Sequence, residues 1–222
     1  MNILILDTET TGVDPRTDVV VELGWVLWSP KFQCILSAAT TLVDEGKGNA
    51  AEAVNGIPPE ALLHIGYSLA RAIDDMPHEF VIGAVMAHNA EFDRSFLPGL
   101  YADRPWICSQ DDVDWPRPST SRSLVALALA HGVGVAAAHR ALDDCLTLAR
   151  LLERAAEMTD IDALLARALR PRATFRALVS YDGRDAAKNA GFRWFPEAKE
   201  WRRRMAREDV AALSFDVREV QP

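Results

Sequence analysis

The stretch Ile3-Leu4-Ile5-Leu6-Asp7-Thr8-Glu9-Thr10-Thr11-Gly12 joins an apolar run to two acidic residues and a turn. The run Ile3–Asp7 predicts a buried strand. Side chains two positions apart on a strand share one face, so Asp7 and Glu9 point the same way. Two carboxylates held this close repel unless a cation lies between them, which predicts a metal site. If this motif stood alone, a polar strand end facing solvent would be the favoured alternative.

A second acidic segment, His88-Asn89-Ala90-Glu91-Phe92-Asp93, follows another apolar run, Val81–Ala87, which also predicts a strand. Asp93 lies near the start of a predicted helix, Glu91–Leu97. An acidic side chain at a helix N-terminus is favourable by itself, because it faces the positive end of the helix dipole. Helix entry and metal binding are therefore equal alternatives for Asp93 when this segment is considered alone.

The third segment, His139-Arg140-Ala141-Leu142-Asp143-Asp144, opens the longest predicted helix, Arg140–Met158. Apolar residues form one broad face of this helix. Asp143 lies on the polar side, where it stays in water, whereas Asp144 lies at the margin of the apolar face. A carboxylate that faces the protein body is costly when unpaired, and a cation would satisfy it. The pattern thus favours Asp144 over Asp143 as a metal ligand.

Together, the three segments, with His139 five residues before Asp144, resemble the motifs of the DEDDh branch of the DEDD (RNase D/DnaQ-like) 3′→5′ exonuclease superfamily. The resemblance covers roughly residues 1–155. It implies a metal-dependent nuclease in which His139 is the general base, a role that suits histidine because its free pKa is near neutral. Without the resemblance, His139 would be interpreted as a surface or capping histidine.

The resemblance also implies two ions, Mg²⁺ or Mn²⁺, roughly 3.5–4 Å apart, that activate water and stabilise the leaving oxygen. Asp7 would bridge both ions. Glu9 and Asp144 would complete the site of the ion that activates water, and Asp93 would support the second ion. The metal ligands are therefore predicted to be Asp7, Glu9, Asp93 and Asp144.

The implied reaction is the stepwise release of nucleoside 5′-monophosphates from nucleic-acid 3′ ends. Thr10, in the turn after Glu9, and Phe92, in the second motif, would flank the 3′-terminal nucleotide. We expect single-stranded nucleic acid or 3′ ends as the partner, with DNA favoured over RNA. An RNA-directed exonuclease resembling oligoribonuclease or RNase T is the alternative, since no residue identifies a contact to the 2′-position. The sequence predicts no oligomeric state.

Strands followed by alternating strands and helices predict an α/β fold, and the resemblance implies an RNase H-like mixed sheet with helices on its faces. Val19–Trp28 and Gln33–Val43 are predicted to follow Ile3–Asp7 in an antiparallel meander.

A boundary near residues 165–172 predicts an exonuclease domain over 1–168 and a small α+β module over 172–222. The other predicted helices of the first domain are Ile57–Ile65, Ser68–Asp75 and Ser123–His131. The module is predicted to contain strands within Thr174–Tyr181, Phe192–Met205 and Phe215–Val220, and helices at Gly183–Ala190 and Glu208–Leu213.

The composition suits a folded protein, because 222 residues with 49% hydrophobic content allow a sizeable core. No run of eighteen or more apolar residues occurs, so no membrane span is expected.

The N-terminal segment lacks the basic region and cleavage site of a signal peptide, and a cytoplasmic location is expected. Cys34, Cys108 and Cys145 match no zinc pattern, which predicts reduced structural thiols.

The net charge of −8 is unevenly distributed along the chain. From Arg167 to Arg207, twelve arginines and lysines accompany four acidic residues, a local charge of +8 that indicates a basic C-terminal module. Phe192, Trp194 and Trp201 are interleaved with these basic residues, a mixture that suits single-stranded nucleic acid. The alternative is that the rings form the core of the small module. The charge, rather than the aromatic residues, favours contact with nucleic acid.

Two other functions fit parts of the sequence. A haloacid dehalogenase-type phosphatase begins with Asp-x-Asp-x-Thr after a strand, which is close to Asp7-Thr8-Glu9-Thr10. Such a fold leaves His139 and Asp144 unexplained. A non-catalytic binding module on the nuclease fold is disfavoured, because the four acidic residues and the histidine are all intact.

Overall fold

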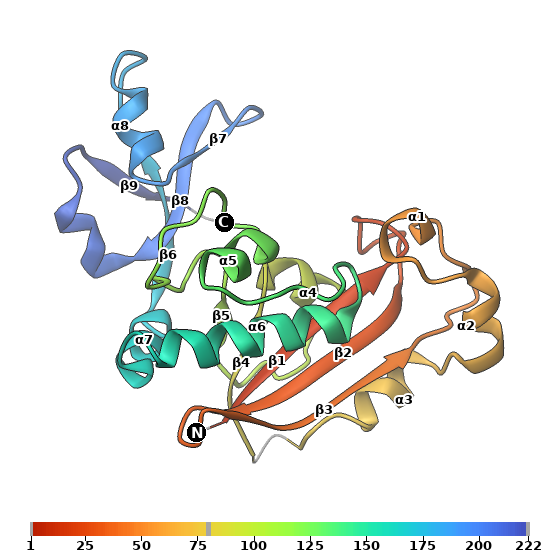
Figure 1. Ribbon diagram of the computed structural model, residues 1–222. Coiled ribbons are helices and arrows are strands. Elements are labelled where there is room, and N and C mark those ends of the chain that lie inside the picture. The colour runs from red at the N-terminus through yellow and green to blue at the C-terminus, as the bar shows by residue number, and fades with distance from the viewer. Residues whose placement is uncertain (1, 79–80, 221–222) are drawn as a thin grey trace. The chain divides into compact units, whose positions relative to one another are not determined.

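Strand β1 (Asn2–Thr10) lies at the centre of a five-stranded mixed sheet in the computed structural model, which describes residues 2–78 and 81–220 (Figure 1). It pairs antiparallel with β2 (Val20–Ser29), which pairs antiparallel with β3 (Cys34–Leu42). On its other side β1 pairs parallel with β4 (Ile82–Ala87), and β4 pairs parallel with β5 (Trp106–Cys108). The predicted meander and mixed sheet are confirmed.

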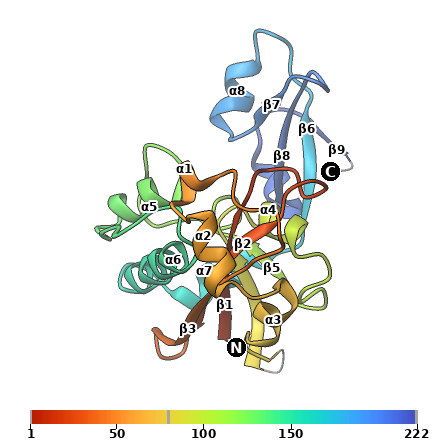
Figure 2. The ribbon, with the colours of Figure 1, turned by 90° about the vertical axis from the view of Figure 1, so that its right-hand side faces the viewer.

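Helices cover both faces of this sheet (Figure 2). Ile3 and Ile5 of β1 face the apolar side of α6, while Leu4 and Leu6 face the opposite side, toward α3 and α4. Odd-numbered residues of β1 therefore point toward α6 and even-numbered residues point away from it. The helices of this part of the chain are α1 (Glu52–Asn55), α2 (Pro59–Ile65), α3 (Leu69–Asp74), α4 (Ala90–Phe96), α5 (Leu124–Ala130), α6 (Ala141–Ala156) and α7 (Ile161–Ala168).

The five helices predicted for the first domain are all present, within a few residues of the expected ends. The predicted helix Ile57–Ile65 begins only at Pro59, because a proline is tolerated in the first helical turn and restricts the residue before it. Helices α1 and α7 and strand β5 were not predicted. The α7 helix is capped by Asp160, whose carboxylate accepts the backbone N–H groups of Asp162 and Ala163.

The chain divides into two compact units, Met1–Leu169 and Arg170–Pro222. The second unit contains a separate antiparallel sheet with the strand order β7-β8-β6-β9, which confirms the predicted α+β character. Phe175, Ala187, Phe192 and Met205 form its core. Its elements are β6 (Arg172–Ala177), α8 (Arg184–Asn189), β7 (Arg193–Phe195), β8 (Glu200–Ala206), the 3₁₀ helix η2 (Arg207–Ala212) and β9 (Val217–Val220).

The aromatic residues of the second unit divide between its core and its surface. Phe192 is buried and Trp201 packs against the core, as the alternative interpretation of these rings predicted. Trp194 contacts Trp201 at a ring-centroid distance of 5.7 Å but stays 47% exposed. Within the described ranges of the chain, no helix is long and apolar enough to cross a membrane.

Candidate metal centre

Asp7 and Glu9 lie on the face of β1 that α6 covers, in line with Ile3 and Ile5. Opposite them on β2 are Gly24, which pairs with Asp7, and Glu22, which pairs with Glu9. The two strands thus place three carboxylates at one end of the sheet. The pairing of β1 with β2 shifts register between Glu9 and Thr10, just after this group of carboxylates.

Gly24 allows the first turn of α6 to lie directly against β2. A Cβ atom at this position would lie 2.5 Å from the main-chain carbon of Ala141 and 2.5 Å from the main-chain nitrogen of Leu142. A glycine inside a strand often marks such a close approach of another backbone. The approach brings the start of α6 over the Asp7 position, and Asp144 lies one turn into the helix.

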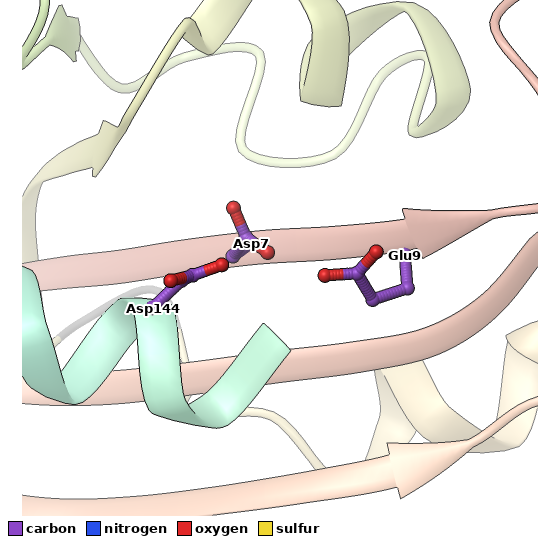
Figure 3. Close-up of side chains that lie close together, drawn as sticks. All are labelled: Asp7, Glu9 and Asp144. Atoms are coloured by element: carbon purple, nitrogen blue, oxygen red, sulfur yellow. The ribbon is translucent and has the colours of Figure 1, made fainter. Parts of the chain in front are cut away.

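Asp7, Glu9 and Asp144 converge on one point. Each of them offers a carboxylate oxygen, and these oxygens lie within 4.8 Å of one another. Figure 3 shows Asp7 and Glu9 on β1 and Asp144 on α6, with the carboxylate of Asp7 lying between the other two. Oxygen ligands at this spacing are the type that Mg²⁺ and Mn²⁺ prefer.

The electrostatics of this cluster favour a bound cation. Burial raises the pKa of Asp7 well above its usual value, and the negative charges of Asp93, Asp144 and Glu9 raise it further. Burial, followed by the charge of Asp144, raises the pKa of Glu9 to about 7. Burial also raises the pKa of Asp144. Carboxylates that repel one another in a buried place are stabilised when a cation lies between them, so the residues fit a divalent metal ion.

Glu22 adds a fourth carboxylate beside the cluster, with 1% of its surface exposed. Its Oε1 atom accepts the Thr40 hydroxyl at 3.0 Å and the Nη2–H of Arg140 at 2.8 Å. Its Oε2 atom accepts the Nε–H of Arg140 at 3.0 Å and the backbone N–H of Ala141 at 3.0 Å. These bonds satisfy the Glu22 charge within the protein, so Glu22 holds the start of α6 rather than facing a metal ion.

His139 lies directly beside Asp144 through its backbone. The His139 N–H donates to Oδ2 of Asp144 at 3.1 Å, and the residue as a whole is exposed. His139 adopts φ of +64°, a left-handed conformation that is uncommon outside glycine. Conformations of this kind occur often at active sites. The backbone of the predicted general base therefore lies next to the acidic cluster, directly before the residues that bond to Glu22.

Asp93 is adjacent to the cluster but is not one of the three converging carboxylates. It is buried, and its Oδ1 atom accepts the backbone N–H of Thr8 at 3.0 Å and the Thr8 hydroxyl at 2.9 Å. Burial raises the pKa of Asp93 to about 7, against the lowering effect of these two bonds. Its charge still acts on Asp7. The structure thus brings Asp93 close to the predicted site but directs one of its oxygens to Thr8.

The two predicted substrate contacts lie near these carboxylates in sequence and are partly enclosed. Thr10 is 8% exposed, and its hydroxyl donates to the backbone oxygen of Gly12. Phe92 is half-buried on α4 and contacts Phe96 at a ring-centroid distance of 5.0 Å. Contact of either residue with a nucleotide stays a prediction.

Glu22 and Gly24 were not identified from the sequence, although both left a signal there. Glu22 is an acidic residue inside the apolar run Val19–Trp28, and a buried charge requires partners. Gly24 interrupts the same strand, where glycine is unfavourable unless a backbone must approach closely. The sequence does not reveal that Glu22 bonds to the first residue of α6 or that Gly24 lets the start of α6 lie against β2.

The fold of this chain is similar to that of solved nuclease structures. The chain is 31% identical over 176 residues to the PolC-type DNA polymerase III of Thermotoga petrophila, and the match covers 70% of this chain. It spans only 12% of the length of that relative. The nuclease domain of 3′hExo, a DEDDh family member bound to rAMP, superimposes with a TM-score of 0.59 at 17% identity, covering 72% of this chain and 94% of that one. The chain shares the fold of this DEDDh-family nuclease domain.

Other solved structures share the DEDDh-type fold. Exonuclease X in complex with 5′-overhanging duplex DNA has a TM-score of 0.61 at 24% identity, covering 75% of this chain and 99% of that chain. The zinc-bound complex of E. coli ExoI with single-stranded DNA has a TM-score of 0.63 at 17% identity, covering 85% and 50%. The predicted RNase H-like fold is confirmed. Residues 173–220 match a family model described as a domain of unknown function (DUF8626).

Proposed function

We propose that the protein is a metal-dependent 3′→5′ exonuclease that releases nucleoside 5′-monophosphates from nucleic-acid 3′ ends, with DNA favoured over RNA. The observation that supports it most directly is the convergence of Asp7, Glu9 and Asp144 within 4.8 Å. Two segments that are distant in sequence contribute these carboxylates, with the backbone of His139 beside them. Asp93, from a third segment, lies near enough for its charge to act on Asp7. A haloacid dehalogenase-type phosphatase would leave His139 and Asp144 unexplained.

We assign the metal ligands to Asp7, Glu9, Asp93 and Asp144, with two Mg²⁺ or Mn²⁺ ions as cofactors. Bound at this site, such ions would activate water and stabilise the leaving oxygen of a phosphodiester. The backbone N–H of His139 holds the Asp144 carboxylate in place at 3.1 Å. The imidazole of His139 takes the proton of the attacking water as general base.

The preference for DNA is supported by the names of the related proteins. The PolC-type relative is a DNA polymerase, and Exonuclease X and E. coli ExoI were solved with DNA. The 3′hExo domain was solved with rAMP, which keeps RNA as the alternative substrate. A cytoplasmic place of action is part of the same proposal.

The test is digestion of DNA and RNA oligonucleotides that carry a label at the 5′ or the 3′ end, with Mg²⁺ or Mn²⁺. We expect a ladder of 5′-labelled products that shorten stepwise, and early release of the 3′ label as a mononucleotide. Asp7→Asn and His139→Ala should each lower the rate by at least about 10²-fold, as loss of a metal ligand or of a general base does. Chelation of the metal should stop the reaction.

Asp143→Asn is the matched control, because Asp143 is the neighbour of Asp144 and lies outside the converging carboxylates. It should cleave at nearly the wild-type rate. Full activity of Asp7→Asn would refute the assignment. Hydrolysis of a small phosphomonoester without any shortening of oligonucleotides would favour the phosphatase instead.

A further inference from the structure

The sheet of the second unit has two chemically different faces. Phe175 of β6 and Met205 of β8 pack with the buried Phe192 and with Ala187 of α8, so they lie on the face that α8 covers. Side chains at alternating strand positions point to the other face. Val210 of η2 also belongs to the apolar cluster around Phe175, so the core of this unit lies on that face of the sheet.

Four arginines form one row across the opposite face. Arg193 of β7 pairs with Arg202 of β8, Arg202 pairs with Arg176 of β6, and Arg176 pairs with Arg218 of β9. Neighbouring strands are about 4.8 Å apart, so this arginine row spans about 14 Å. Each strand of the sheet contributes one guanidinium to it. Arg204, two positions after Arg202 on β8, extends the positive charge along the same face.

Such a row is unfavourable for the folded sheet by itself, because like charges directly opposite one another on neighbouring strands repel. Glu200 is the one acidic residue among the strand positions of this face. Its carboxylate accepts the Nη1–H of Arg176 at 2.7 Å and the Nε–H of Arg202 at 2.9 Å. Both ends of the row, Arg193 and Arg218, are exposed.

An aromatic ring lies at one end of the arginine row. Phe195 shares the face with Arg202, whose guanidinium lies 5.7 Å from the centre of the ring. Phe195 is 45% exposed, so its ring is available to a further flat partner. Cations that follow phosphates, next to a ring on which a base can stack, are the features of surfaces that bind single-stranded nucleic acid.

We infer that the arginine row binds the phosphate backbone of single-stranded nucleic acid, with Phe195 available to stack on a base. Guanidinium groups suit phosphates because they donate paired hydrogen bonds and keep their charge. A bound polyanion would lower the repulsion between like charges on neighbouring strands. This binding site belongs to the second unit alone and goes beyond the proposed exonuclease activity.

The test measures binding of a fluorescent single-stranded oligonucleotide to the full chain in EDTA, by anisotropy over a range of salt concentrations. Catalysis cannot occur without metal, so the result is independent of the proposed nuclease function. The double variant Arg193→Gln/Arg218→Gln should bind roughly tenfold more weakly at 0.1 M salt, and the slope of log K against log salt should fall by about 1.4, since each lost contact removes about 0.7.

The matched control is Lys188→Gln/Arg207→Gln, which removes the same number of charges away from the arginine row. Lys188 is exposed on α8, and Arg207 pairs with Glu219, which is opposite Phe175 on the apolar face. The control should bind within about twofold of wild type, since its residues are outside the proposed contact. Wild-type affinity of the first double variant, or an equal loss in both, would overturn the inference.

Glu200→Gln should raise the affinity for the oligonucleotide, a change that partial unfolding of the variant would not produce. It removes the acidic charge of this face and releases Arg176 and Arg202 from their present bonds. It should tighten binding by at least about threefold, as the loss of one repelling charge near phosphates does. Weaker or unchanged binding by the folded variant would count against the arginine row as the contact surface.

Discussion

The Glu22 carboxylate on β2 accepts the backbone N–H of Ala141, the first residue of α6, at 3.0 Å. The two residues are 119 positions apart in the chain. Arg140, at the N-cap position, makes no side-chain cap of its own, so the buried glutamate caps the helix that carries Asp144. The position of Asp144 relative to Asp7 therefore depends on β2 as well as on β1.

Glu22→Gln should loosen the start of α6. Glutamine keeps an acceptor for one N–H group but loses the charge-assisted bonds to Arg140, which are worth about 1.5–3 kcal/mol in favourable cases. We expect the free energy of unfolding to fall by about 1–2 kcal/mol, since Arg140 is partly exposed. The Mg²⁺ concentration that gives half-maximal nuclease activity should rise roughly tenfold, as it does when a residue that orients a metal ligand is lost.

Glu153→Gln is the control for this change, because Glu153 is on the same helix and pairs with Arg150 near the opposite end. Its Mg²⁺ dependence should match that of wild type. If Glu22→Gln also keeps the wild-type Mg²⁺ dependence, Glu22 does not position Asp144.

Gly24→Ala should displace α6 from the sheet. The new Cβ would lie 2.5 Å from backbone atoms of Ala141 and Leu142, and backbone cannot swing aside as a flexible side chain can. Overpacking of this kind costs about 1–3 kcal/mol of stability. Because a displacement of about 1 Å can lower a rate 10²-fold, activity should fall by about that factor. Thermal unfolding and oligonucleotide digestion measure the two effects.

Gly134→Ala controls for the loss of a glycine, since no atom lies within 4 Å of the position of its added Cβ. It should leave the rate of digestion unchanged. A Gly24→Ala variant as active as Gly134→Ala would show that the close approach to α6 is not needed.

Asp93 allows its structural role to be separated from its charge. Asp93→Asn keeps an oxygen that can accept the N–H and hydroxyl of Thr8, so the fold should remain as stable as wild type, or become more stable, because Asp7 loses a repelling neighbour. Asp93→Ala loses both hydrogen bonds and should cost about 1–3 kcal/mol. If Asp93 supports a metal ion, both variants should lose activity by at least about 10²-fold. Denaturant unfolding and digestion, compared for the pair, test this, and an active Asp93→Asn variant would leave Asp93 with the structural role alone.

Stability without metal should decrease as the pH rises from roughly 4 to 7. The folded state raises the pKa values of Glu9 and Asp93 to about 7 and also raises those of Asp7 and Asp144. The folded chain therefore binds more protons than the unfolded chain in this range, and the free energy of unfolding declines with pH. Urea unfolding in EDTA at pH 5 and pH 8 measures the difference.

Saturating Mg²⁺ should reduce this loss at pH 8, because an ion that binds only the folded state stabilises it. Asp7→Asn should show a smaller pH dependence than wild type in EDTA, whereas Asp143→Asn should behave as wild type. A stability that rises with pH in EDTA would contradict the raised pKa values.

We propose that the two units are separate domains, an exonuclease domain and an accessory module. A chain that ends at Leu169 should then unfold cooperatively and shorten oligonucleotides in Mg²⁺, while its binding to single strands in EDTA should weaken and depend less on salt. Circular dichroism checks the fold of the shortened chain. Failure of that chain to fold would contradict the division into domains.

The sequence alone determined much of the fold and pointed to three acidic residues that meet in it, Asp7, Glu9 and Asp144. Alternation along β1 predicted that Asp7 and Glu9 share a face, because side chains on a strand repeat every two residues. The helical period of α6 places Asp144, but not Asp143, at the margin of the apolar face, and only Asp144 joins the cluster. The missed helix α7 had a usable signal in Asp160, but a helix of this length depends on packing more than on its own sequence.

Only the tertiary structure decided which distant residues meet. Nothing in the local sequence links Glu22 and Gly24 to Ala141, because strand register and the approach of a helix are set by packing between elements. The same holds for the bond of Asp93 to Thr8 and for the arginine row, where one residue of slip in any strand would turn its arginine to the other face. Local periodicity tells which way a side chain points, whereas its partners are fixed by contacts between segments far apart in the chain.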